Sequence, residues 1–277
     1  MPTLLTLHRP AKPGLFVTGT DTGVGKTVAA CLIADQWRRA PSADSPTSSV
    51  GVLKPIATGC RVEREGLVCD DAEALAHAAD FDPEIGDLDL INPLRFRAAL
   101  APAAAAERET GVARVDWSLV DRSLSRLDSM CARLVIEGIG GLLVPLEHRA
   151  RGADVLTGLD LARAIGYPVV VVCRAGLGTL SHTAMTCRII RDAGLTLAGL
   201  IVNGYDPDAP DLSMQSNREW LARQNHARIV ATLPGRISEC RITPRPGEPE
   251  WNPRAIPPGL RAAIDATDFA ALARPGR

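Results

Sequence analysis

GTDTGVGKT, residues Gly19–Thr27, is the stretch of this sequence that decides its fold. It follows a short apolar run, Leu15–Val17, and leads into a helix-compatible stretch, Val28–Arg39. A strand, a glycine-rich loop and a helix in this order favour phosphate binding, because the loop and the helix start offer backbone N–H groups to an anion. Lys26 would reach the β- and γ-phosphates, and the Thr27 hydroxyl would bind Mg²⁺. The first glycine lies one residue earlier than the usual spacing, so an ordinary tight turn is the alternative.

The composition is that of a globular protein with little net charge. Of the 277 residues, 46% are hydrophobic and 23% are charged, and the net charge is −1. This charge gives no reason to expect binding to nucleic acid or to a charged membrane surface. No apolar run approaches the roughly 20 residues of a membrane span, and the N-terminus lacks a signal-peptide core. The seven cysteines are scattered and include no Cys-x-x-Cys pair, which indicates reduced thiols in a cytoplasmic protein.

Six β-rich runs alternate with helical stretches, a pattern that predicts an α/β fold. Several runs are apolar almost throughout, as is typical of parallel strands covered by helices on both faces. We expect an open, mainly parallel sheet of the P-loop NTPase type, in a single domain over residues 1–277 with a core of about 14–236. The expected strands are Leu15–Thr18, Val50–Lys54, Arg133–Glu137, Val169–Cys173, Leu197–Asn203 and Ile229–Leu233.

Apolar side chains at helical spacing predict helices between these strands. One such stripe follows Asp116, which is a candidate N-cap. The apolar stripes run over 117–131 and 155–165, and a short final helix is expected over 260–273. Two stretches, 39–49 and 243–259, are expected to be loops. The second loop-like stretch holds six prolines, so it cannot form a regular helix or a central strand.

Charged side chains follow two of the expected strands, at the edge of the sheet where ligands gather. Lys54 ends the second strand and is either a surface lysine or a cation directed at phosphate. Glu137 ends the third strand and is followed by Gly138–Gly141, an arrangement of the Walker-B kind that holds Mg²⁺. Asp70 and Asp71 open a predicted helix, where a role as its N-cap competes with a role as metal ligand.

Two later segments also follow strands. Leu177–His182 begins a helix whose free N–H groups would suit a carboxylate. The adjacent Ser181 and His182 do not form a hydrolase site, because no Gly-x-Ser-x-Gly turn is present. Asn203 could bind a purine edge with its amide, or be a simple turn residue.

Taken together, these segments resemble the dethiobiotin synthetase family, the ATP-dependent cyclo-ligases of biotin synthesis. The matching pieces lie in family order and are Val17–Thr27, Lys54–Gly59, Asn92–Pro93, Leu100–Pro102, Ile136–Gly141, Leu177–His182 and Leu197–Asn203. The resemblance implies that 7,8-diaminopelargonate and CO₂ (or bicarbonate) form a carbamate, which attacks ATP to give a carbamic–phosphoric anhydride. The second amine then closes the ring of dethiobiotin, and ADP and phosphate are released.

The resemblance also implies roles for single residues. ATP would be bound by Gly23, Val24, Gly25, Lys26, Thr27, Val28, Asp71, Glu137, Gly138, Ile139, Gly140, Asn203, Gly204, Leu233, Pro234 and Gly235. Mg²⁺ would be held by Thr27, Asp71 and Glu137, and the catalytic residues would be Lys54 and Lys26. The diamine would contact Thr22 and Thr58, and its carboxylate would bind across a homodimer interface to Gly178, Thr179, Leu180 and Ser181. Family members often have glutamate at the position of Gly23 and asparagine at that of Ser181.

Two other classes share this kind of phosphate loop. The first is a related ATP-dependent ligase or amidotransferase of the cobyrinate diamide synthase group, whose glutaminase domain would find little room in 277 residues. The second is a switch ATPase of the ParA/MinD type. That family places a signature lysine at the position of Asp21, and this chain has no basic amphipathic C-terminal helix for a membrane.

Overall fold

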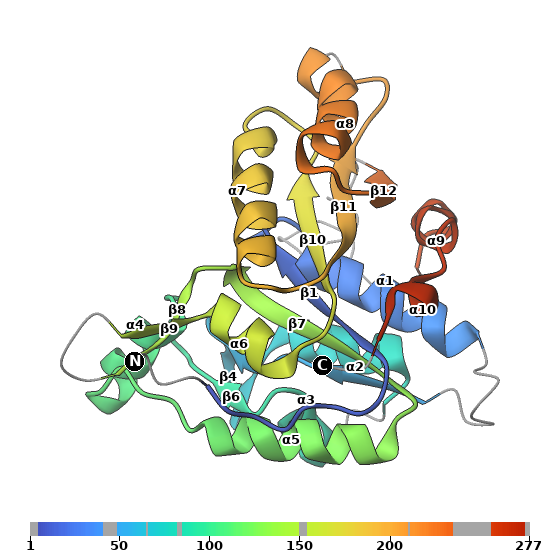
Figure 1. Cartoon of the computed structure of the whole chain (residues 1–277). Helices are drawn as coiled ribbons and strands as arrows, with labels where there is room; N and C mark the ends of the chain where they lie inside the picture. The colour runs from blue at the N-terminus through green and yellow to red at the C-terminus, as the bar shows by residue number, and fades with distance from the viewer. Residues whose placement is uncertain are drawn as a thin grey trace.

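A six-stranded parallel sheet forms the centre of the computed structural model, which describes residues 5–40, 49–64, 66–81, 85–149, 154–209, 211–234 and 256–274 (Figure 1). The strand order is β12-β11-β10-β1-β7-β2. The strands are β1 Gly14–Gly19, β2 Val50–Leu53, β7 Arg133–Gly141, β10 Val169–Arg174, β11 Leu197–Tyr205 and β12 Ile229–Pro234. These are the six strands that the sequence predicts. β7 and β11 extend furthest past their expected ends, β1, β10 and β12 end one residue later than expected, and β2 ends one residue earlier, at Leu53, so that Lys54 follows it. The fold class is confirmed.

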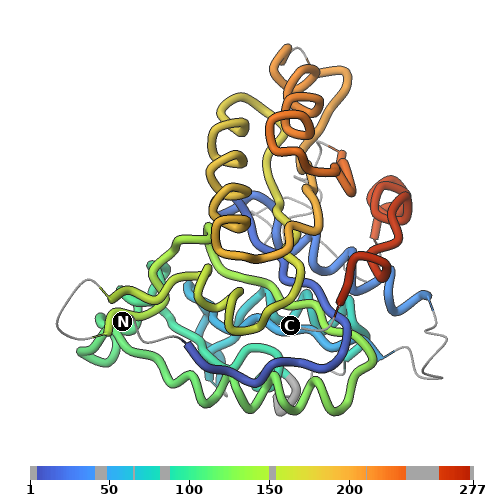
Figure 2. Tube along the Cα trace, in the orientation of Figure 1, coloured from blue at the N-terminus to red at the C-terminus, as the bar shows by residue number. Residues whose placement is uncertain are grey.

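Both faces of the sheet are covered by helices, because alternate side chains of each buried strand point to opposite faces. Leu15 and Val17 pack into one apolar cluster, and Phe16 packs into the other. The first cluster includes side chains of α1 (Lys26–Arg39), α2 (Asp70–Ala79), α9 (Pro258–Asp265) and α10 (Phe269–Leu272). The second includes those of α4 (Pro102–Thr110), α5 (Trp117–Met130), α6 (Gly158–Ile165), α7 (Thr179–Asp192) and α8 (Leu212–Asn225). Figure 2 shows the trace winding through these two layers.

The helix expectations hold in part. Asp116 caps α5 by accepting the N–H of Ser118, as its position predicts. The helix expected from residue 155 begins only at Gly158, because Val155–Thr157 forms β9, which pairs with β8 (Pro145–His148). The final helix is divided into α9 and α10, with Thr267 between them donating its hydroxyl to the carbonyl of Val230.

Several short elements around the sheet were not predicted from the sequence. They are β3 Ile56–Ala57, β4 Arg61–Glu63, β5 Gly66–Val68, β6 Leu94–Arg95 and α3 Ile85–Ile91, together with α4 and α8. Most of the expected loops over 39–49 and 243–259 lies outside the described residues, as do Gly235 and Cys240. The six described cysteines carry free thiols. Among the described helices, none combines the length and the apolar character that crossing a membrane requires.

The segment before β1 is bound along α5, as the blue trace of Figure 2 shows. Asp128 of α5 accepts the backbone N–H groups of Ala11 and Lys12 at 3.0 and 2.9 Å. The imidazole Nε2 of His8 lies 2.9 Å from the same carboxylate. One helix carboxylate therefore holds the entry of the chain into the sheet.

Candidate functional site

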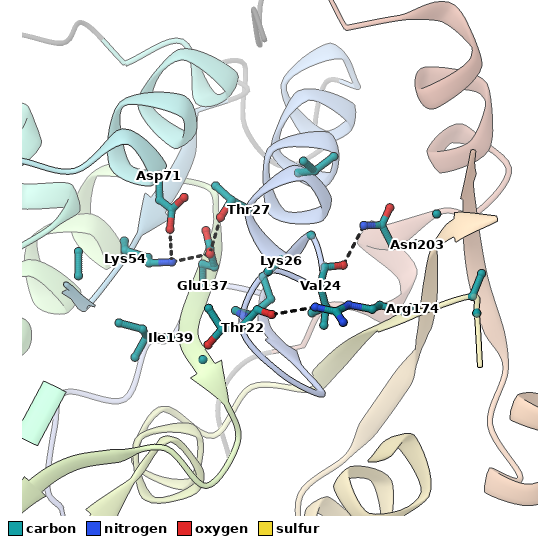
Figure 3. A pocket seen from close by; sticks show the side chains of 18 of the residues that line it. Thr22, Val24, Lys26, Thr27, Lys54, Asp71, Glu137, Ile139, Arg174 and Asn203 are labelled. Atoms are coloured by element: carbon teal, nitrogen blue, oxygen red, sulfur yellow. Dashed lines mark hydrogen bonds and ion pairs between the residues drawn. The ribbon is translucent and has the colours of Figure 1, made fainter. Parts of the chain in front are cut away.

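A cavity of about 790 Å³ lies at the carboxyl ends of the central strands (Figure 3). Fifteen of the residues that the sequence analysis names line it: Thr22, Gly23, Val24, Gly25, Lys26, Thr27, Val28, Lys54, Thr58, Asp71, Glu137, Ile139, Gly140, Asn203 and Gly204. They come from sheet strands or the segments after them and from α2. The sheet topology thus brings these residues together in one cavity, although Thr22 and Gly204 are 182 positions apart in the sequence.

The phosphate loop connects β1 to α1 along one wall of the cavity. Gly25, at the N-cap of α1, has a φ of 97°, and a Cβ atom there would clash with the amide of Asn203. Asn203 is buried and donates its amide N–H to the carbonyl of Val24 at 2.8 Å. The Nζ of Lys26 donates to the carbonyl of Asp21 at 2.8 Å, so this side chain folds back over the loop. The loop is therefore shaped by its own contacts, with glycine required where it meets β11.

An ionic cluster of two buried side chains, Lys54 and Glu137, and the partly exposed Asp71 lies beside the loop. Lys54 Nζ is 2.7 Å from Asp71 Oδ2 and 2.5 Å from Glu137 Oε1. The Thr27 hydroxyl donates to the same Glu137 oxygen at 2.7 Å. Only 2% of Lys54 is exposed, and Glu137 is fully buried. The alternative of Lys54 as a surface lysine is therefore wrong, and its role as a cation directed at phosphate stays a prediction.

Backbone contacts fix the position of Lys54. Its N–H donates to the carbonyl of Ile91 at 2.8 Å, and its carbonyl accepts the side-chain amide of Asn92 at 2.6 Å. The alternative of Asp71 as the N-cap of α2 is also wrong: Cys69 occupies the cap position, Asp71 follows inside the helix, and its carboxylate binds Lys54.

The electrostatics of the cluster depend on burial and on its charge partners. Burial alone would lower the pKa of Lys54, but Asp71 and Glu137 raise it above the usual value, so the ammonium is charged. Burial raises the pKa of Glu137, against the attraction of Lys54. For Asp71, burial acts in the same upward direction, but Lys54 overcomes it and the pKa is lowered. Burial, followed by repulsion from Lys54, lowers the pKa of Lys26 to about 8.

The hard oxygen atoms of this cluster fit Mg²⁺. The second carboxylate oxygen of Glu137, Oε2, is buried and has no hydrogen-bond partner among the described residues. Mg²⁺ is usually held by one or two carboxylates together with substrate phosphates and water. In the described part of the chain no group of three or more His, Cys, Asp or Glu side chains could enclose a metal ion. The donors present therefore suit a cation that ATP brings in.

Other expected residues lie outside the cavity within a single chain. They are Gly138, Leu233, Pro234 and the turn Gly178, Thr179, Leu180 and Ser181, while Gly235 lies outside the described residues. Gly138 is nevertheless close, since its carbonyl is 3.5 Å from Lys54 Nζ. Leu233 and Pro234 end β12, beside the end of β11 that carries Asn203.

Six residues that line the cavity were given no individual role from the sequence, although Ala57 and Leu177 lie in segments that it singles out: Ala57, Arg174, Ala175, Gly176, Leu177 and Met214. Arg174 carried a usable signal, because it ends a strand just as Lys54 follows one. Met214 carried none, because it lies in α8 and reaches the cavity only through the packing of that helix.

Comparisons with known proteins identify the relatives of this chain. A family model described as an AAA domain matches residues 13–238. The chain is 44% identical to the ATP-dependent dethiobiotin synthetase BioD of Anaeromyxobacter sp. (strain K) over 224 residues, 80% of this chain and 89% of the relative. It is 38% identical to that of Parafrankia sp. (strain EAN1pec) over 259 residues, 92% and 96% of the two chains.

Solved structures resemble the fold at low sequence identity. The cell-division ATPase MinD of Pyrococcus furiosus matches with a TM-score of 0.50 and 14% identity, covering 95% of this chain and 98% of its own. The MinD cell-division protein of Aquifex aeolicus matches with a TM-score of 0.51 and 12% identity, covering 91% and 94%. At such identities the likeness concerns the fold alone.

Proposed function

The chain belongs to the ATP-dependent dethiobiotin synthetase family, and we infer from this that it is a ligase that makes dethiobiotin from 7,8-diaminopelargonate, CO₂ and ATP. The structural observation that supports this function is the pairing of the buried Lys54 with Asp71 and Glu137 beside a phosphate loop. The reaction requires a binding site for the ATP phosphates and a fixed positive charge for the carbamate, and here the two would lie side by side. The chain would act as one domain and, as a biosynthetic enzyme, in the cytoplasm.

The side chains would act mainly by positioning and by neutralising charge. The loop N–H groups and Lys26 would hold the phosphates of ATP. Lys54 would stabilise the carbamate oxygen as it bonds to the γ-phosphorus and the bond from that phosphorus to ADP breaks. Mg²⁺, held by Thr27, Asp71 and Glu137, would neutralise phosphate charge when bound. The second amine of the diamine would then attack the carbonyl carbon of the anhydride, which expels phosphate and closes the ring.

Asn203 would bind the adenine with its side-chain oxygen, Oδ1, which makes no hydrogen bond with the loop. Its Nδ2 is engaged by Val24, whereas its Oδ1 is buried without a hydrogen-bond partner among the described residues. A buried acceptor without a donor is costly, and the exocyclic amine of adenine is a donor. Gly204 and the end of β12, Leu233–Pro234, would flank the ring; the remaining ATP contacts would come from Gly23, Val28, Gly138, Ile139 and Gly140.

The active unit would be a homodimer. Gly178 to Ser181 begin α7 but do not line the cavity of their own chain, and 89% of the neighbouring Leu177 is exposed. Exposed N–H groups at this helix start would bind the substrate carboxylate of the other subunit. Thr22 and Thr58, which do line the cavity, would contact the diamine from its own side.

The rival classes lack a comparable observation in their favour. Asp21 stands where switch ATPases of the ParA/MinD type have their signature lysine, so likeness to MinD extends to the fold only.

Product analysis tests the function directly. The purified chain is incubated with 7,8-diaminopelargonate, bicarbonate, ATP and Mg²⁺, and dethiobiotin is measured by mass spectrometry beside phosphate. We expect one phosphate released for each dethiobiotin formed, and no product when the diamine is left out. Phosphate release at the same rate without the diamine, and no dethiobiotin, would exclude the synthetase.

A further inference from the structure

Arg174 is placed against the phosphate loop by the way in which two neighbouring strands end. β1 and β10 pair as far as Gly19 and Val172, and the N–H of Thr20 donates to the carbonyl of Val172. β1 then turns into the loop, while β10 continues for two more residues. The last residue of β10, Arg174, pairs with Asn203 of β11, and its side chain contacts the loop that follows β1.

The guanidinium group of Arg174 reaches the first half of the loop. Its Nη2 donates to the carbonyl of Thr22 at 3.3 Å (Figure 3). A Cβ atom on Gly23 would be 4.0 Å from the same nitrogen, an ordinary van der Waals distance, so Arg174 lies against this part of the loop. The residue lines the cavity and is exposed to it.

Lys26 and Arg174 converge on the same part of the loop. Lys26 Nζ donates to the carbonyl of Asp21, and Arg174 Nη2 to that of Thr22, the next residue. A phosphate-loop lysine binds the β- and γ-phosphates. The two cationic groups are thus held on adjacent peptides of the loop.

Arg174 differs from the other two cations of the cavity in its partners. Lys54 is neutralised by two carboxylates, and Lys26 is buried. Among the described residues Arg174 has no carboxylate partner and one side-chain hydrogen bond, to a neutral carbonyl. A guanidinium group has five N–H donors in a planar fork that matches phosphate oxygens. Most of its donors thus remain for a ligand.

We propose that Arg174 is a further phosphate-binding residue, which binds the β/γ end of the nucleotide together with Lys26. It would add positive charge beside the transferred phosphoryl group, whose three oxygens share the charge of the transition state. The proposal relies on the proposed function only in requiring ATP at this loop.

Nucleotide binding, measured without the diamine, tests the proposal independently of product formation. AMP, ADP and a non-hydrolysable ATP analogue are titrated by calorimetry, in Mg²⁺, into the parent chain, Arg174→Ala and Arg174→Lys. We expect Arg174→Ala to raise the Kd of the ATP analogue about 10- to 100-fold, the scale of a charged hydrogen bond. For the same variant the Kd of ADP should rise less than that of the ATP analogue, and the Kd of AMP should change less than about twofold. Arg174→Lys should recover part of the loss, because it keeps the charge but not the fork.

Arg188→Ala is the matched control. It removes the same charge from an exposed position on α7, where Arg188 pairs with Asp192. An unchanged affinity of Arg174→Ala for the ATP analogue would overturn the proposal. So would an equal loss for AMP, which indicates that Arg174 only shapes the loop, or the same loss in Arg188→Ala. Thermal unfolding without nucleotide should be the same for all variants, because Arg174 is exposed. If the chain shows these nucleotide affinities but makes no dethiobiotin, the proposed synthetase function is wrong, whereas the phosphate-binding role of Arg174 still holds.

Discussion

The ammonium of Lys54 lies 2.5 Å from the carboxylate of Glu137, and both side chains are buried. With Asp71 at 2.7 Å from the same nitrogen, one lysine neutralises carboxylates from β7 and α2. A substrate anion that reaches Lys54 must compete with both carboxylates. Cations that engage Asp71 and Glu137 would release the lysine for that anion.

Replacing Lys54 by alanine should therefore affect both catalysis and folding. We expect dethiobiotin formation to fall about 10²–10³-fold, the scale of removing one charge-stabilising contact, with ATP still bound. Without Mg²⁺, the free energy of unfolding should also fall by about 3–5 kcal/mol, because the buried carboxylate of Glu137 and the partly exposed carboxylate of Asp71 lose their counter-charge. Steady-state kinetics, ATP titration and urea unfolding measure the three effects.

Lys12→Ala is the control, since Lys12 is exposed before β1 and does not line the cavity. It should leave rate and ATP affinity unchanged. Phosphate release that needs no diamine and is unaffected by Lys54→Ala would instead favour a switch ATPase.

The second prediction concerns Lys26, whose ammonium donates a hydrogen bond to the carbonyl of Asp21 and forms no ion pair among the described residues. Lys26→Ala should weaken ATP binding and abolish turnover, because the phosphates lose the lysine charge. The circular dichroism spectrum and the unfolding midpoint should stay near those of the parent chain, since no ion pair of Lys26 is broken. Normal ATP affinity in a folded Lys26→Ala protein would place the nucleotide elsewhere.

The third prediction is a pH dependence of stability at Asp128. Burial alone raises the pKa of this carboxyl, but the N–H groups of Ala11 and Lys12 and the imidazole of His8 lower it below the usual value. A lowered carboxyl pKa stabilises the fold above the unfolded pKa of about 3.9, and this contribution is lost as the pH falls through the folded pKa. Asp128→Ala should thus cost about 1–3 kcal/mol at neutral pH, as expected for hydrogen bonds to a charged group.

Urea unfolding as a function of pH measures this effect. The difference between the parent chain and Asp128→Ala should shrink as the pH falls below about 4. Asp192→Ala, at an exposed position of α7, serves as the control and should change stability little. A difference that stays constant with pH would show that the Asp128 carboxylate does not hold the segment before β1.

The sequence predicted the sheet well because each central strand is an apolar run buried on both faces. The same rule located Lys54 and Glu137, since side chains at the ends of parallel strands meet at one edge. It also applied to Arg174, but the expected strand stopped at Cys173, one residue short of it. Pairing with Asn203 of β11 extends β10 to that residue, and this contact is not visible in local sequence.

Other differences arise from tertiary contacts that override local patterns. Val155 fits the helical stripe that continues to Ile165, but it pairs with His148 in a two-stranded sheet. Asp70 and Asp71 are typical cap residues, yet the helix begins so that Asp71 reaches Lys54. The pair β4–β5 is short and largely exposed, so hydrophobic periodicity cannot reveal it.

The fourth prediction concerns the start of α7, where the proposed homodimer would bind the substrate carboxylate. Gly178 has a φ of 90° at the N-cap, and a Cβ atom there would meet nothing within 4 Å in its own chain. Bulk at this position therefore has no neighbour in its own subunit to disturb, although the backbone conformation is strained. Gly178→Val should raise the KM for the diamine far more than the Kd for ATP. Gly194→Val, at another glycine with a φ of 75° and open space, is the matched control for strain and should leave the diamine KM unchanged.

A mixed dimer of Lys54→Ala and Gly178→Val chains makes the test of shared sites sharper. If each site takes Lys54 from one subunit and Gly178 from the other, one site of the mixed dimer carries both lesions and the other carries neither. Mixing two nearly inactive proteins should then restore about half of the parent activity to each mixed dimer, since one of its two sites is intact. If each site lay within one subunit, both sites of the mixed dimer would carry one lesion, and mixing would restore nothing. No recovery after subunit exchange is confirmed by native mass spectrometry, or full activity in a protein shown to be monomeric, would therefore rule out the shared site.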